Sequence, residues 1–290
     1  MQLLEGKKVS EEILDEIKVE VDKILQQGKR APHLAVVLVG NNPASETYVG
    51  SKIKACERVG FKSTLVKLPD TIDEASLLKE IKKLNDDTTL DGFIVQSPLP
   101  KHISDSNVIN AISPAKDVDG FHPENVGRMA LNMPAYLPAT PFGIVQLIDR
   151  YKIPTAGKHC VVLGRSHIVG LPVSLLMVRN AKPGNCTVTI CHSKTVDTKK
   201  HTLQADILIV ATGQVESVTS DMVKEGAVVI DVGITRVPDA TKKSGYRIAG
   251  DVKFDEVAPK CSFITPVPGG VGPMTIASLL MNTLNGYKRK

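Results

Sequence analysis

The chain has 290 residues, 42% of them hydrophobic, so it is long enough to fill the cores of two domains of ordinary size. Its formal charge of +5 is the balance of 36 basic and 31 acidic residues spread along the sequence, and only 4% of the residues are aromatic, with no tryptophan. This composition excludes a nucleic-acid-binding stripe, whereas a mild positive charge suits anionic small molecules. No stretch approaches the roughly 18 apolar residues of a membrane span, and the N-terminus predicts a polar-capped helix rather than a signal or transit peptide.

The cysteines indicate neither a disulfide framework nor a metal site. They are odd in number and form no Cys-x-x-Cys pair or other metal-ligand spacing. We therefore expect no bound metal and a reducing cytoplasm as the location. The positions are 56, 160, 186, 191 and 261.

The first half of the chain predicts a βαβ series. Short apolar runs, typical of buried strands, alternate with helical stretches. The strands are expected at 34–39, 63–68 and 93–96, and the helices at 44–59 and 73–85.

After a Pro/Gly/Ala-rich stretch at 134–143 and a helix near 142–151, the strand pattern begins again. Alternating strands and helices predict a parallel sheet covered on both faces, so the fold class is α/β with two βα lobes, the second a doubly wound Rossmann-type domain. We place the domains at 1–140, completed by a C-terminal helix at 272–290, and at 141–271. The second set of strands is expected at 160–163, 187–191, 206–210 and 227–231.

Tyr48 and Lys52 lie four residues apart in a helical stretch capped by Asn42 or Ser45, so both side chains leave one face of the helix. They can enter one pocket together. Short-chain dehydrogenases also carry a Tyr/Lys pair at this spacing, but there the glycine-rich turn precedes the pair, and here it follows. The plain alternative is an amphipathic helix with an exposed lysine.

Gln96 and Asp119 are the polar residues expected beside that helix. Gln96 ends the apolar run 92–95 and is held there by Pro98 and Pro100, so it points into the crevice at the carboxyl edge of a parallel sheet. Asp119, in the turn 116–120, offers a carboxylate that can take two parallel hydrogen bonds from the guanidine-like edge of a pterin. An acid in such a turn is otherwise an ordinary turn residue.

The strand that ends at 163 runs into Gly164-Arg165-Ser166, where a dinucleotide fold turns into a helix whose N-terminal amides bind phosphate. The next strand ends in Cys191-His192-Ser193, without the acid that holds a ribose 2′-hydroxyl in NAD sites. Arg165 and Ser166 can instead bind a 2′-phosphate, which favours NADP. A plain strand-to-helix turn, and a structural role for His192, are the alternatives.

The segment 265–275 (TPVPGGVGPMT) holds three prolines and three glycines, so it must be a shaped loop rather than helix or ordinary strand. Its nearly side-chain-free backbone lets a flat ligand approach main-chain groups closely. The apolar run 276–284 that follows predicts an anchoring helix.

Together, the segments 48–52, 91–100, 116–120 and 265–275 make the chain resemble the methylenetetrahydrofolate dehydrogenase/cyclohydrolase (FolD) family, from about residue 4 to residue 287. The resemblance implies oxidation of 5,10-methylenetetrahydrofolate by NADP⁺ to the 5,10-methenyl form, and its hydrolysis to 10-formyltetrahydrofolate. It implies Lys52, Tyr48 and Gln96 as catalytic residues. The implied substrate-binding residues are Tyr48, Lys52, Val95, Gln96, Ser97, Asp119, Pro268, Gly269 and Gly272, and the implied cofactor-binding residues are Gly164, Arg165, Ser166, Ser193 and Ile234.

The resemblance also implies a cleft between the lobes, a homodimer through the second domain, polyglutamylated folate substrates, and service to purine, methionine and histidine biosynthesis. One departure stands out: Ser97 replaces the leucine of the family's usual Val-Gln-Leu-Pro segment, which opens space beside Gln96. Because of this departure, a dehydrogenase with a weakened or lost cyclohydrolase step stands as an alternative. A non-catalytic folate- or nucleotide-binding protein that kept the fold is a second alternative, against which the presence of Lys52 with Gln96 argues.

Overall fold

The structure, a computed structural model, describes residues 1–242 and 245–290 and divides into two compact units. We call residues 1–10 with 140–275 the six-stranded unit, and residues 11–139 with 276–290 the three-stranded unit. This grouping differs from the expected domains at 1–10, 140 and 272–275. The reason at the N-terminus is that β1 (Gln2–Leu3) pairs in parallel with β11 (Phe263–Ile264).

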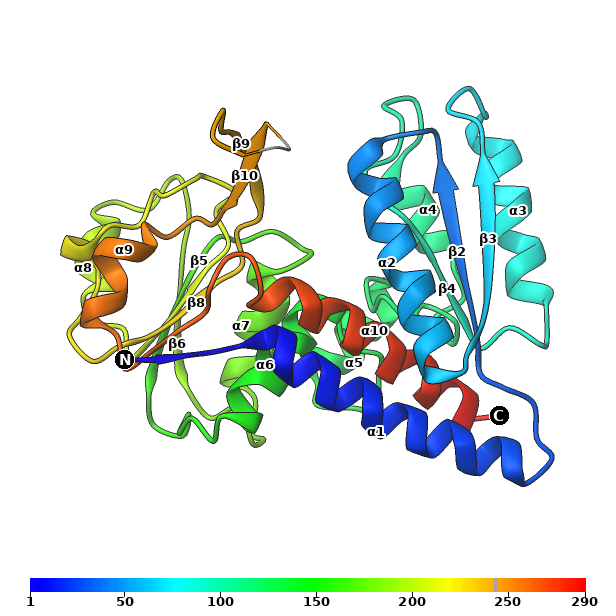
Figure 1. Ribbon diagram of the computed structural model, residues 1–290, viewed down its shortest axis with the longest axis horizontal. Helices are drawn as coiled ribbons and strands as arrows, with labels where there is room; N and C mark the ends of the chain where they lie inside the picture. Colours follow the sequence, from blue (N-terminus) through cyan, green and yellow to red (C-terminus); the bar gives the residue numbers. More distant parts are fainter. Residues whose placement is uncertain (243–244) are drawn as a thin grey trace. The chain divides into compact units, whose positions relative to one another are not determined.

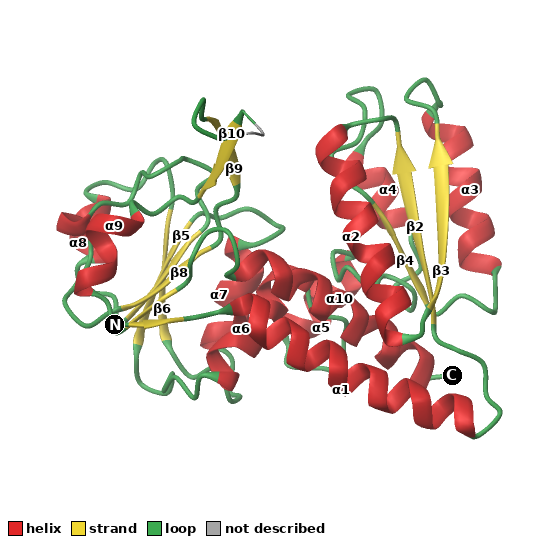
Figure 2. Ribbon diagram, viewed as in Figure 1, coloured by secondary structure: helices red, strands yellow, loops and turns green. Residues whose placement is uncertain are grey.

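In the described part of the six-stranded unit, the sheet has the order β1-β11-β8-β7-β5-β6, and every pairing is parallel (Figure 2). Strands β5 to β8 lie within a residue of the sequence prediction, because each is a short apolar run. They are β5 (His159–Leu163), β6 (Thr187–Cys191), β7 (Ile207–Val210) and β8 (Val228–Asp231).

β5 is buried on both faces of this sheet. Val161 and Leu163 belong to one hydrophobic core, while Cys160 and Val162 are equally buried on the opposite side. α7 packs against β5 and β6. Two-sided burial explains why these strands are continuous apolar runs rather than alternating ones. The helices of the unit are α6 (Ala139–Arg150), α7 (Gly170–Val178), α8 (Thr198–Thr202) and α9 (Phe254–Val257), with 3-10 turns η1 (Ser220–Met222) and η2 (Ala258–Lys260).

The sequence patterns did not indicate β1, β11 or an antiparallel hairpin formed by β9 (Thr235–Pro238) and β10 (Tyr246–Ala249). β1 and β11 have two residues each, which is too short for a periodic signal. In the hairpin, half-buried and exposed residues alternate, so it lacks a continuous apolar run.

The three-stranded unit holds a parallel sheet of order β3-β2-β4 among its described residues (Figure 1). One face of β2, with Ala35, Val37 and Val39, packs against α3 and α4, and α2 packs against the sheet as well. The bounds are β2 (His33–Val39), β3 (Lys62–Leu68), β4 (Gly92–Val95), α2 (Pro43–Val59), α3 (Glu74–Asp86), α4 (Asp105–Ala111) and α5 (Pro123–Ala130).

Two long helices, α1 (Gly6–Gln26) and α10 (Val271–Lys288), contribute residues to both units. The part of α10 in the three-stranded unit is tied to it by Asn282, whose side chain donates to Val118 O at 2.8 Å and Leu137 O at 2.9 Å. No described helix is long and apolar enough to span a membrane. The five cysteines are buried and free.

Candidate active site and cofactor pocket

The centre of the candidate active site is a buried lysine on α2. The helix begins after Asn42, whose side-chain oxygen accepts hydrogen bonds from Ala44 N at 3.0 Å and Ser45 N at 3.1 Å. Tyr48 and Lys52 follow on one face, as their spacing predicts. Lys52 is only 5% exposed, and its Nζ lies 5.6 Å from the centroid of the Tyr48 ring. A buried ammonium group needs a polar partner, so the residue that supplies one belongs to the site.

That partner is Gln96, which follows β4 directly after the buried Val95. Its backbone N donates to Val37 O at 2.9 Å, which extends the strand pairing by one residue. Lys52 Nζ donates to Gln96 Oε1 at 2.9 Å, and Gln96 Nε2 donates to Ser97 O at 2.7 Å. The amide is therefore oriented at both ends and presents its oxygen to the lysine. Ser97 acts through its backbone carbonyl, which does not depend on the identity of its side chain.

Asp119 lies in a braced turn. Its backbone O accepts a hydrogen bond from Ala139 N at 3.2 Å, and its side chain is half-buried. The buried Asp117 holds the turn by accepting hydrogen bonds from Gly120 N at 3.1 Å and His122 N at 2.8 Å. Among the described residues, no hydrogen bond reaches the Asp119 carboxylate. The turn thus holds a carboxylate that retains its capacity to accept hydrogen bonds from a ligand.

The charges of the cluster act on one another. Burial lowers the pKa of Lys52, and the negative charge of Asp119 opposes that shift. Burial raises the pKa of Asp119, and the Lys52 cation opposes it. Burial and Asp119 both raise the pKa of the Tyr48 hydroxyl. The Lys52 amine therefore reaches its neutral form at a lower pH than an exposed lysine does, which suits a group that exchanges protons during a reaction.

The second site is a pocket of ≈ 420 Å³ at the carboxyl ends of β5, β6 and β7. The chain passes from β5 to β6 on one side, and β7 lies on the other side of β5, so the pocket sits where open α/β sheets bind ligands. Its lining residues are Leu163, Gly164, Arg165, Ser166, Cys191, His192, Ser193, Thr198, Ala211, Thr212, Gln214, Ser217, Val218 and Met222.

The glycines at the mouth of this pocket leave room for close backbone approach. Gly164 has φ +117°, and a Cβ there would collide with Ala211 O. A Cβ on Gly170, the first residue of α7, would collide with Gly164 O. These positions fit a dinucleotide cofactor, whose pyrophosphate requires a side-chain-free turn before a helix N-terminus.

Three predicted cofactor residues, Arg165, Ser166 and Ser193, are exposed and line the same pocket. Ser166 Oγ accepts hydrogen bonds from Val169 N at 3.1 Å and from the first amide of α7 at 3.4 Å, so it caps that helix. Its hydroxyl proton remains available to a ligand. His192 Nδ1 accepts a hydrogen bond from the N–H of residue 194 at 3.1 Å, which gives this histidine a role in shaping the turn.

The remaining predicted residues belong to the six-stranded unit but do not line its pocket. Ile234, between β8 and β9, is 56% exposed. Pro268 is exposed, and Gly269 has φ +105° and accepts a hydrogen bond from Lys7 N at 2.8 Å through its carbonyl. Gly272 lies in the first turn of α10. The segment 265–270 is a shaped loop, as its composition predicts. Residues 271–275, expected in the same loop, instead form the first turn of α10, where Pro273 is tolerated because the amides of a first turn have no partner within the helix.

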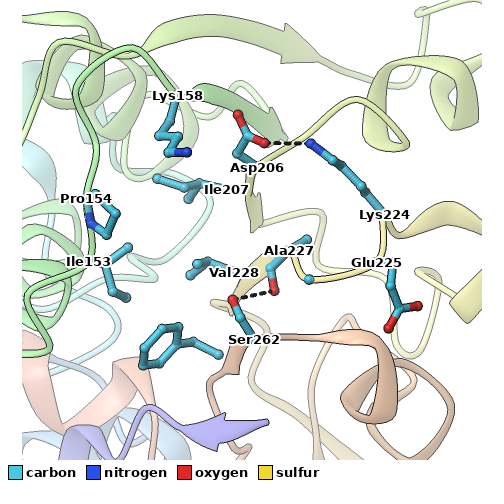
Figure 3. A pocket seen from close by; sticks show the side chains of 12 residues that line it. Ile153, Pro154, Lys158, Asp206, Ile207, Lys224, Glu225, Ala227, Val228 and Ser262 are labelled. Carbon is cyan, nitrogen blue, oxygen red and sulfur yellow. Dashed lines mark hydrogen bonds and ion pairs between the residues drawn. The ribbon is translucent and has the colours of Figure 1, made fainter.

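A second, smaller hollow of the six-stranded unit lies at the opposite, amino edge of the same sheet (Figure 3). Its floor is apolar, with Ile207 and Val228, and at its rim Lys224 Nζ forms an ion pair with Asp206 Oδ1 at 2.6 Å. That pairing neutralises these two charges, while Lys158 and Glu225 also line the hollow. Across the described residues, no group of three or more histidine, cysteine or acidic side chains is arranged to hold a metal.

The sequence patterns did not indicate two buried acids beside the cofactor pocket, Asp231 and Asp251. Both follow or end a strand, and Asp251 accepts three hydrogen bonds from residues 212 and 213, the first of which lines the pocket. The available signal is an acid placed directly at the carboxyl end of a buried strand, as in 228–231.

Comparison with known proteins gives matches over nearly the whole chain. Residues 4–119 match the family model described as tetrahydrofolate dehydrogenase/cyclohydrolase, catalytic domain, and residues 138–290 match the NAD(P)-binding domain of the same family. A relative from Cytophaga hutchinsonii, named bifunctional protein FolD, is 66% identical over 290 residues and is covered completely, as is this chain.

Solved structures agree. The bifunctional FolD methylenetetrahydrofolate dehydrogenase/cyclohydrolase of Campylobacter jejuni matches with a TM-score of 0.93 at 48% identity, covering 100% of this chain and 99% of that one. The Trypanosoma brucei dehydrogenase-cyclohydrolase, solved with NADP and an inhibitor, matches with a TM-score of 0.93 at 38% identity, covering 98% and 96%. The chain belongs to the tetrahydrofolate dehydrogenase/cyclohydrolase family.

Proposed function

We propose that this chain oxidises 5,10-methylenetetrahydrofolate to 5,10-methenyltetrahydrofolate with NADP⁺ and hydrolyses the product to 10-formyltetrahydrofolate. Family membership over both domains supports this proposal. The single observation that carries the chemistry is the buried Lys52 amine, hydrogen-bonded to Gln96 at 2.9 Å and electrostatically coupled to Asp119.

For the oxidation, bound NADP⁺ supplies the hydride acceptor, and the chain positions the two reactants. Gly164 would leave room for the pyrophosphate, and Arg165 with the hydroxyls of Ser166 and Ser193 would hold the 2′-phosphate. Ile234, outside the pocket lining, would contact the nicotinamide. Because no acid is among the described residues that line the pocket, a 2′-phosphate would meet no repulsion there.

For the hydrolysis, Lys52 exchanges the proton of the attacking water. In its neutral form, the amine accepts one proton as the water attacks the methenyl carbon, and it delivers that proton to the ring nitrogen as the ring C–N bond breaks. The remaining hydroxyl proton of the tetrahedral adduct is released to solvent as the formyl C=O forms. Gln96 accepts a hydrogen bond from the Lys52 amine and thereby orients the lone pair of the lysine nitrogen. Tyr48 covers the lysine and stabilises its cationic form through the ring face.

Asp119 anchors the pterin, since its carboxylate has unused acceptors that match two neighbouring N–H groups. Val95 and Ser97, which flank Gln96 in the chain, belong to the folate-binding surface of the three-stranded unit. Gly120, beside the anchor, has φ +77°, and a Cβ there would approach Leu137 C at 2.5 Å, so the turn that presents the carboxylate requires glycine.

We further propose a cytoplasmic homodimer, formed through the six-stranded unit, that acts on polyglutamylated folates and supplies one-carbon units to purine, methionine and histidine biosynthesis. Five buried, unbridged cysteines suit a reducing compartment.

A two-reaction assay tests the proposal. Purified protein is mixed with 5,10-methylenetetrahydrofolate and NADP⁺, and the absorbance of NADPH is followed together with that of the methenyl intermediate. We expect NADPH to form and the intermediate to decay faster than it does without enzyme. Accumulation of the intermediate at its uncatalysed rate of decay would establish a dehydrogenase without the second step. Absence of NADPH formation would refute the enzyme and favour a binding protein.

A further inference from the structure

Two buried carboxylates join three loops at the carboxyl edge of the six-stranded sheet. Asp231 ends β8 and Asp251 follows β10, and they are 3% and 0% exposed. We call Asp231 and Asp251 the carboxylate pair. Neither takes part in the chemistry proposed above, and buried acids are uncommon unless they are paired or hydrogen-bonded.

Asp251 holds the turn after β7. Its Oδ2 accepts hydrogen bonds from Thr212 N at 2.7 Å, Gly213 N at 2.8 Å and Thr212 Oγ1 at 3.0 Å. Thr212 lines the cofactor pocket, and so does Ala211 directly before it. One carboxylate oxygen therefore sets the position of the pocket wall that β7 contributes.

Asp231 holds Asp251 in turn. Its Oδ1 accepts hydrogen bonds from Asp251 N at 3.0 Å and Gly233 N at 2.9 Å, and its Oδ2 accepts one from Val252 N at 2.9 Å. The site is closely packed, since a Cβ on Gly233 would collide with Asp251 and a Cβ on Gly250 would collide with Asp231. Each of the three donors to Asp231 is a backbone amide of a loop at the carboxyl edge of the sheet.

One atom of the pair is not satisfied. Within the described chain, Asp251 Oδ1 is buried and has no hydrogen-bond partner. Leaving a buried acceptor unpaired next to a second carboxylate opposes folding, so stability alone does not explain this arrangement. Asp251 is unfavourable for the stability of the fold and is hydrogen-bonded to a residue that lines a ligand pocket. This combination indicates a functional constraint.

We propose that Asp251 is a positioning residue for the dinucleotide cofactor. Supported by Asp231, it fixes Thr212 and Gly213 in the wall of the cofactor pocket, so that cofactor affinity depends on its carboxylate. This inference rests on the proposed function for the identity of the cofactor. It goes beyond the residues expected to touch the cofactor, because Asp251 acts through the backbone of another loop.

The test compares Asp251→Ala, Asp251→Asn and a matched control, Asp206→Ala. Asp206 also accepts a backbone hydrogen bond in the same unit, from His159 N at 3.0 Å, but at the amino edge of the sheet, away from the cofactor pocket. NADPH dissociation constants are measured by titration without folate, and cyclohydrolase activity is measured on methenyltetrahydrofolate without NADP. The second reaction serves as an internal check of folding.

We expect Asp251→Ala to weaken NADPH binding by about tenfold or more, since hydrogen bonds to a charged acceptor are lost. Asp251→Asn keeps an oxygen for the two amides, so it should restore most of the affinity. Cyclohydrolase activity should stay within about twofold of wild type in all folded variants, well under the tenfold step that one lost charged contact produces. Asp206→Ala should lower the melting temperature without changing the dissociation constant.

Unchanged NADPH binding in Asp251→Ala would overturn the proposal, as would an equal loss of affinity in Asp206→Ala. If Asp251→Ala does not fold, Asp251→Ser is measured under the same criteria, because its hydroxyl is too short to reach both amides. Failure of the proposed function is seen separately, since the wild-type protein would then neither bind NADPH nor hydrolyse the methenyl substrate.

Discussion

Replacing Lys52 by methionine removes the one titratable amine of the candidate active site while keeping the length and helical propensity of the side chain. The structure sets the size of the expected effect. Lys52 is 5% exposed and donates a hydrogen bond to Gln96 at 2.9 Å. An exposed lysine elsewhere on the surface therefore does not replace its amine in the mutant. Losing a general acid–base group costs roughly 10²–10⁴-fold in rate, and we expect that loss in the cyclohydrolase step.

The oxidation should keep measurable activity in Lys52→Met, because hydride transfer requires no proton transfer at the reacting carbon. The assay follows the methenyl intermediate, which should accumulate in the mutant and decay at close to its uncatalysed rate. Lys54→Met is the matched control, since Lys54 lies on the same helix but is exposed, and both of its activities should remain at wild-type level. Undiminished decay of the intermediate in Lys52→Met would refute the role proposed for this lysine.

Three other changes test separate parts of the structure. Arg165→Ala should raise the Michaelis constant for NADP⁺ by about ten- to a hundredfold and leave that for NAD⁺ nearly unchanged, since a charged bidentate contact contributes roughly 1.5–3 kcal/mol; equal use of both cofactors by the wild type would contradict this. Asp119→Asn should raise the folate Michaelis constants of both reactions. It should also move the rising limb of the cyclohydrolase pH profile to lower pH, because the Asp119 charge raises the pKa of Lys52; a limb that stays in place would show that the two charges are not coupled. Gly120→Ala should lower the free energy of unfolding by at least about 1 kcal/mol, measured by urea denaturation, whereas Gly127→Ala, in open space on α5, should raise it by about 0.5–1 kcal/mol; similar effects of both substitutions would refute the steric argument.

Much of the candidate site can be located from sequence, because its signals are local. The four-residue spacing of Tyr48 and Lys52 places both on one face of α2. Gln96 is indicated by its position directly after a buried apolar run, at the carboxyl edge of a parallel sheet. The glycine at 164 after such a run likewise marks the mouth of the cofactor pocket.

The environment of these residues is not local. The hydrogen bond from Lys52 to Gln96 joins residues 44 positions apart, and those from Thr212 to Asp251 join residues 39 positions apart. Neither pairing leaves a periodic pattern in the chain. The effect of Ser97 also differs from the one expected from the sequence. Its backbone carbonyl, rather than its side chain, orients Gln96.

The α/β class, the core strands and the helix face that carries Tyr48 and Lys52 can be read from the amino-acid order, because apolar periodicity and short spacings are properties of neighbouring residues. The burial of Lys52, the pairing of β1 with the distant β11 and the support that Asp251 gives to a pocket wall follow from the folded chain. Burial and hydrogen-bond partners depend on which distant segments pack together. The pKa of a lysine and the position of a loop therefore follow from the assembled fold rather than from the local sequence.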